Sequence, residues 1–125
     1  MERLDCVLEI TNWIKRFHGK VVRINTNGQG NLLNPSRNTV MEFKEAGVDK
    51  ISISLNAHNK ETYNKICRPK FKNAYESVLR FVNDARKQIY TEVTAVTINE
   101  VNFIKLVELT KALNVRLRRR DYISY

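Results

Sequence analysis

The sequence predicts an α/β fold, an incomplete (β/α) barrel of about four parallel strands alternating with helices. Two observations predict it. Segments with apolar residues spaced three and four apart alternate with short segments rich in β-branched residues, and the connections between them are short. Such strands run parallel and are joined by right-handed crossovers, and four of them form an open sheet or an arc. A length of 125 residues fits a single domain over 1–125.

The elements follow one another in the order αβαβαβαβ. Residues 3–17 place apolar side chains on one helical stripe, and Gly19 ends that helix before a short buried strand at 20–25. A second helix begins at 34–36 and ends at Gly47. The later elements are a strand at 48–55, helices at 60–67 and 74–85, a strand at 90–98, a helix at 101–113 and a strand at 115–123.

The chain is basic, with 22 Lys and Arg against 13 Asp and Glu and a net charge of +9. This charge favours encounter with anions, so a small basic α/β module that binds nucleic acid or a nucleotide is an alternative function. The densest basic run is 116–120, with Tyr122 and Tyr125 nearby. Arg116, Arg118 and Arg120 share one side of a strand and form either a ladder at a barrel mouth or a solvated edge.

The sequence shows neither an apolar run long enough to cross a bilayer nor a signal-peptide pattern, so we expect a cytoplasmic protein without membrane contact. Its two cysteines, Cys6 and Cys67, fit neither a disulfide framework nor the spacing of a zinc site. We expect both to be buried as small apolar residues. No residue is assigned a catalytic or metal-binding role.

Two segments at predicted strand ends suit a ligand. The loop at 25–31 combines amide, hydroxyl and glycine backbone groups, which suits a polar small molecule, although an ordinary turn has the same composition. Ser52, Ser54 and Asn56 point to one side of their strand. In an open surface sheet this side would be the wet face. A parallel strand covered by helices seldom has a wet face, so this side favours a ligand-lined barrel interior. Further polar groups from the next strand are Thr94 and Thr97, or Glu92.

Four segments together resemble radical SAM enzymes, and within them the subgroup described as TatD family-associated radical SAM proteins. The segments are Arg23–Asn31, Val48–Ala57, Glu61-Thr62-Tyr63 and Cys67-Arg68-Pro69. Such enzymes hold a [4Fe–4S] cluster in a Cys-x-x-x-Cys-x-x-Cys loop and cleave S-adenosylmethionine to a 5′-deoxyadenosyl radical. The resemblance implies S-adenosylmethionine as cofactor, with binding residues Thr26, Asn27, Gly28, Ser54 and Asn56; Asn56 would reach the ribose or the substrate.

The sequence departs from the family pattern because it contains no three-cysteine loop and no Gly-Glu-Pro-like segment. We therefore expect the C-terminal part of a radical SAM barrel, inactive by itself, with the cluster held by a missing N-terminal portion. Both edges of the predicted sheet, at 21–25 and 115–123, would then be unpaired. This predicts a homodimer or a complex with an N-terminal radical SAM half.

Overall fold

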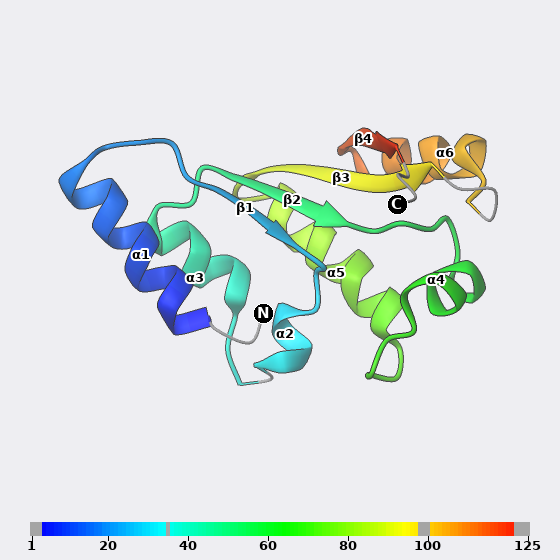
Figure 1. The fold of residues 1–125 in the computed structure, drawn as a ribbon, viewed down its shortest axis with the longest axis horizontal. Coiled ribbons are helices and arrows are strands. Elements are labelled where there is room, and N and C mark those ends of the chain that lie inside the picture. Colours follow the sequence, from blue (N-terminus) through cyan, green and yellow to red (C-terminus); the bar gives the residue numbers. More distant parts are fainter. Residues whose placement is uncertain (1–3, 35, 98–100, 122–125) are drawn as a thin grey trace.

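Four strands form one parallel sheet, in which the strand order follows the chain (Figure 1). The computed structural model describes residues 4–34, 36–97 and 101–121. The strands are β1 (Arg23–Thr26), β2 (Lys50–Ser54), β3 (Tyr90–Thr97) and β4 (Arg116–Asp121). The predicted fold class is confirmed: the strands alternate with helices in an open sheet. The predicted strand residues 98, 122 and 123, with Tyr125, lie outside the described residues.

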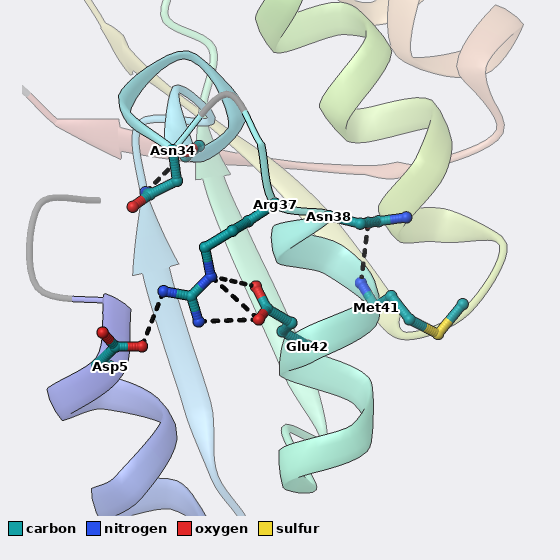
Figure 2. Close-up of polar contacts among 7 residues, drawn as sticks. Asp5, Asn34, Arg37, Asn38, Met41 and Glu42 are labelled. Carbon is teal, nitrogen blue, oxygen red and sulfur yellow. Dashed lines mark hydrogen bonds and ion pairs between the residues drawn. The ribbon is translucent and has the colours of Figure 1, made fainter.

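Helices connect the strands at nearly every predicted position. They are α1 (Leu4–Phe17), α2 (Gly30–Leu33), α3 (Thr39–Ala46), α4 (Lys60–Cys67), α5 (Ala74–Arg86) and α6 (Phe103–Leu113). The single turn α2 was not predicted. The following helix starts later than predicted, because Asn38 is its N-cap and accepts a hydrogen bond from the Met41 N–H at 3.1 Å (Figure 2).

Asparagine side chains define where three of the helices begin. Asn38, Asn59 and Asn102 each accept a hydrogen bond from the backbone N–H three residues later. An N-cap of this kind satisfies one of the N–H groups that have no partner within the helix. Gly47 and Asn114 end α3 and α6 in the left-handed conformation, at φ 102° and 57°.

The core lies between the sheet and the helices below it in Figure 1, where α3 and α5 cover one side of the strands. Ile51 and Ile53 of β2 and Val93 of β3 are fully buried on this side, as are Val78 and Val82 of α5. Burying each such side chain contributes roughly 1.5–3 kcal/mol. The helix-facing side of the sheet therefore carries most of the fold's apolar burial.

Helix α1 packs against α3, and Arg37 links the two. Its guanidinium donates to Asp5 Oδ1 of α1 at 2.8 Å and to Glu42 Oε1 of α3 at 2.8 Å (Figure 2). Leu4 is buried, but the apolar stripe predicted for this helix is only partly covered. Its outer residues Ile10, Trp13 and Phe17 are 59%, 54% and 63% exposed. The stripe is wider than the surface that one neighbouring helix can cover.

No described helix is both long enough and apolar enough to span a membrane.

Candidate functional site

The strand register gives the sheet two chemically different sides. On one side lie Ile24, Ile51, Ile53, Val93, Ala95 and Leu117, which face the helices. The other side is here called the interior face, and on it lie Arg23, Asn25, Lys50, Ser52, Ser54, Tyr90, Glu92, Thr94, Val96, Arg116, Arg118 and Arg120. The predicted polar side of β2 is therefore continuous with polar residues of three other strands. Arg116, Arg118 and Arg120 belong to this face, and the shared side is common to both alternatives, the ladder and the solvated edge.

Glu92 is the centre of a buried polar network on the interior face. The Ser52 hydroxyl donates to Glu92 Oε1 at 2.6 Å, Lys50 Nζ lies 3.3 Å from Oε2, and Arg118 Nε lies 3.6 Å from Oε1. Glu92 is 1% exposed. Burial raises the pKa of Glu92, but the hydrogen bonds from Ser52 and Lys50 and the charges of Lys50 and Arg118 lower this pKa by more. The net pKa lies below its ordinary value, so Glu92 is a buried carboxylate at neutral pH.

The loop after β1 folds back on itself through short side chains. The Gly28 N–H donates to Thr26 Oγ1 at 3.2 Å, and the Gln29 N–H donates to Asn27 Oδ1 at 3.0 Å. Thr26 pairs with Ile53 in the register and faces the helices, where it is buried. Asn27 is exposed. Of these predicted site residues, Asn27 is therefore accessible to a ligand, while Thr26 holds the loop in shape.

Gly28 is required at its position for two reasons. Its φ of 76° lies in the left-handed region, which disfavours any residue with a Cβ. A Cβ there would also lie 3.0 Å from Val78 Cγ1 and 3.1 Å from Ile53 Cγ2. The next residue, Gln29, donates through Nε2 to the hydroxyl of Tyr63 at 2.9 Å and so ties this loop to α4. Burial raises the pKa of Tyr63, which keeps its hydroxyl protonated.

The segment after β2 presents a second set of polar groups. Ser54 lies on the interior face and accepts a hydrogen bond from Thr94 Oγ1 at 3.4 Å. Asn56 has a φ of 65°, a conformation that asparagine tolerates better than most residues. Its Nδ2 donates to Cys67 Sγ at 3.9 Å. Ser54 and Asn56 are both half-buried, so their polar atoms can still reach a ligand.

The two segments lie side by side because β1 and β2 are adjacent parallel strands and both segments follow their carboxyl ends. Ligands of open α/β sheets bind at this end of the strands. The arrangement brings Asn27, Ser54 and Asn56 to one edge of the sheet, where amide and hydroxyl groups can bind a polar small molecule. Gly28 is buried beneath this edge.

The two cysteines differ in exposure. Cys6 is exposed, so its predicted burial is wrong: α1 turns Leu4 toward the core and Cys6, two residues later, away from it. Cys67 is half-buried at the end of α4, and burial raises the pKa of its thiol. Among the described residues, no three or more His, Cys, Asp or Glu side chains are grouped to hold a metal ion. A [4Fe–4S] cluster needs closely grouped thiolates, which these residues do not supply.

Comparison with known proteins identifies the family. A search of the curated proteins found no match. The family model described as the radical SAM superfamily matches residues 3–113, a range that includes β1 to β3 and α1 to α6 of the described structure. The polar edge after β1 and β2 lies within the matched region. The chain belongs to the radical SAM superfamily.

Proposed function

We propose that this chain forms the part of a radical SAM enzyme that binds S-adenosylmethionine and substrate. The proposal includes a separate polypeptide segment that carries the cysteine ligands of the [4Fe–4S] cluster, without which the chain is inactive. The observation that carries the proposal is the polar edge where the carboxyl ends of β1 and β2 meet. Membership of the superfamily supports S-adenosylmethionine as the ligand of this edge.

The described contacts support different roles for the five residues of the proposed site. Asn27, Ser54 and Asn56 have accessible polar groups and would hydrogen-bond S-adenosylmethionine. Thr26 and Gly28 would position the loop, because the Thr26 hydroxyl accepts from the Gly28 N–H and both residues are buried. The narrower assignment to the TatD-associated subgroup is part of the proposal and rests on the Thr-Asn-Gly and Ser-Leu-Asn-Ala segments.

A binding experiment tests the site. Isothermal titration calorimetry would measure the affinity of the chain for S-adenosylmethionine, with the variant Asn56→Gly, which keeps the backbone at φ 65° and removes the amide. Loss of one hydrogen bond of about 1–1.5 kcal/mol weakens binding roughly tenfold. The matched control is Asn114→Gly, the same change at a left-handed residue that ends α6. Equal affinities for both variants would contradict the assignment of Asn56.

The dependence on a second segment is tested by reconstitution. The chain would be treated anaerobically with iron and sulfide, alone and mixed with a polypeptide encoded immediately upstream that carries the three-cysteine loop. Formation of 5′-deoxyadenosine from S-adenosylmethionine would then be measured. Product only in the mixture supports the proposal. Product from the chain alone contradicts the proposed dependence, and product from neither sample contradicts the proposed enzyme.

A further inference from the structure

The interior face of the sheet is strongly cationic. Among the described strand residues it carries five cationic side chains, Arg23, Lys50, Arg116, Arg118 and Arg120, and one carboxylate, Glu92. We infer that this face binds a small molecule with a multiply charged oxyanion group, either phosphate or carboxylate. That the bound anion is the substrate rests on the function proposed above; the binding itself does not.

The Glu92 network leaves cationic donors available for a second anion. Lys50 and Arg118 approach the same carboxylate, at 3.3 and 3.6 Å, so one negative charge is shared between two positive charges. Both distances are longer than the 2.7–2.9 Å typical of a strong charge-assisted hydrogen bond. Arg118 meets Glu92 through Nε, which leaves its two terminal nitrogen atoms for another acceptor.

The position of these cations favours an occupant on the interior face. Glu92 is almost completely buried, whereas the side chains of Lys50 and Arg118 are 28% and 41% exposed. The carboxylate therefore lies beneath the two cations and holds them in place. An oxyanion that approaches from the open side meets the ammonium and guanidinium groups before it meets the carboxylate.

The composition of the face favours a small molecule over a nucleic acid. Surfaces that bind single-stranded nucleic acid combine cations with aromatic side chains on which bases stack. One described residue of the interior face is aromatic: Tyr90, which pairs with Lys50 in the register and whose ring centre lies 5.4 Å from Lys50 Nζ. A single ring offers one stacking position, whereas these surfaces stack successive bases on several rings. The ring of Phe103 contacts Arg119 of β4 at 5.3 Å, on the side that faces the helices. Four strands about 4.8 Å apart make a surface roughly 14 Å wide, which suits a molecule of metabolite size.

Two neighbouring arginines provide a matched test. Arg118→Gln and Arg119→Gln each remove one positive charge from β4, but on opposite sides of the sheet. Calorimetry at fixed ionic strength would measure binding of inorganic pyrophosphate, citrate and a 12-nucleotide single strand. We expect Arg118→Gln to weaken binding of pyrophosphate or citrate at least fivefold and Arg119→Gln less than twofold. Equal weakening, absence of saturable binding of both small anions, or tighter binding of the oligonucleotide would overturn the inference.

A third variant is expected to strengthen the binding of small anions, whereas Arg118→Gln is expected to weaken it. Glu92→Gln removes the carboxylate charge but keeps a side-chain oxygen that can accept the hydrogen bond from the Ser52 hydroxyl. Binding of the preferred small anion should become several-fold tighter, and unchanged or weaker binding by the folded variant would count against the inference. If this variant does not fold, the Arg118 and Arg119 pair decides the question. Pyrophosphate and citrate binding need no S-adenosylmethionine, so failure of this site and failure of the proposed function are distinguishable.

Discussion

Replacing Gly28 by alanine tests the claim that this glycine shapes the loop of the proposed site. The substitution adds a single Cβ at a residue with φ 76°. That atom would lie 3.0 Å from Val78 Cγ1 and 3.1 Å from Ile53 Cγ2, both in the packed core. Neither neighbour can easily move, because each belongs to a fully buried β-branched side chain. The backbone and the core must both adjust.

The expected loss of stability has two parts. A left-handed backbone conformation costs a residue with a Cβ roughly 1–2 kcal/mol. Overpacking of a dense core costs a further 1–3 kcal/mol, approximately. The unfolding free energy of Gly28→Ala should therefore fall by about 2–5 kcal/mol. For a domain of this size, the melting temperature should fall by on the order of 10 °C.

Gly19→Ala is the matched control. Gly19 has a φ of 60°, similar to that of Gly28, but a Cβ there meets no atom within 4 Å. This variant should show only the conformational part of the loss, about 1–2 kcal/mol. Urea denaturation followed by circular dichroism would measure both variants. Equal losses would refute the reasoning, because they would show that contact with Val78 and Ile53 carries no penalty.

Two further predictions concern Glu92 and α1. Because the folded-state pKa of Glu92 is lowered, its contribution to stability is present above its unfolded pKa of about 4.3 and is lost as pH falls through the folded pKa. Urea denaturation between pH 3 and 6 should show a flatter pH dependence for Glu92→Gln than for wild type; identical profiles would contradict this. The exposed apolar residues of α1 add to the sheet edges as a surface for the expected homodimer, so Trp13→Lys should shift a self-associated chain toward monomer in light scattering. A strictly monomeric wild-type chain at high concentration would exclude this.

The sequence predicts the elements well because their periodicities are local. The alternation of Ser52 and Ser54 with Ile51 and Ile53 predicts both sides of β2, and the register confirms it. The same alternation, applied to Ile24, would have placed Thr26 on the side that faces the helices. This signal was present in the sequence.

Other features depend on the register between strands, which no local pattern specifies. Lys50 of β2 and Arg118 of β4 both approach Glu92 of β3, and they do so only because these three strands pair side by side. From the sequence, Glu92 is predicted only as an alternative to Thr94 and Thr97 as a polar group of this strand. Its contacts with Lys50 and Arg118 are not predicted. The exposure of Cys6 was also missed, because a cysteine in an apolar stretch gives no indication of which side of the helix its neighbours will cover.

The two sides of the sheet differ in how much a substitution costs in stability. The side that faces the helices holds the fold together, so most changes there reduce stability by several kcal/mol, approximately. Arg23, Asn25 and Arg116 of the interior face are exposed, and changes at such positions usually alter stability by less than about 0.5 kcal/mol. Substitutions at such exposed positions can therefore change which ligand the interior face prefers, while the side that faces the helices continues to hold the fold together.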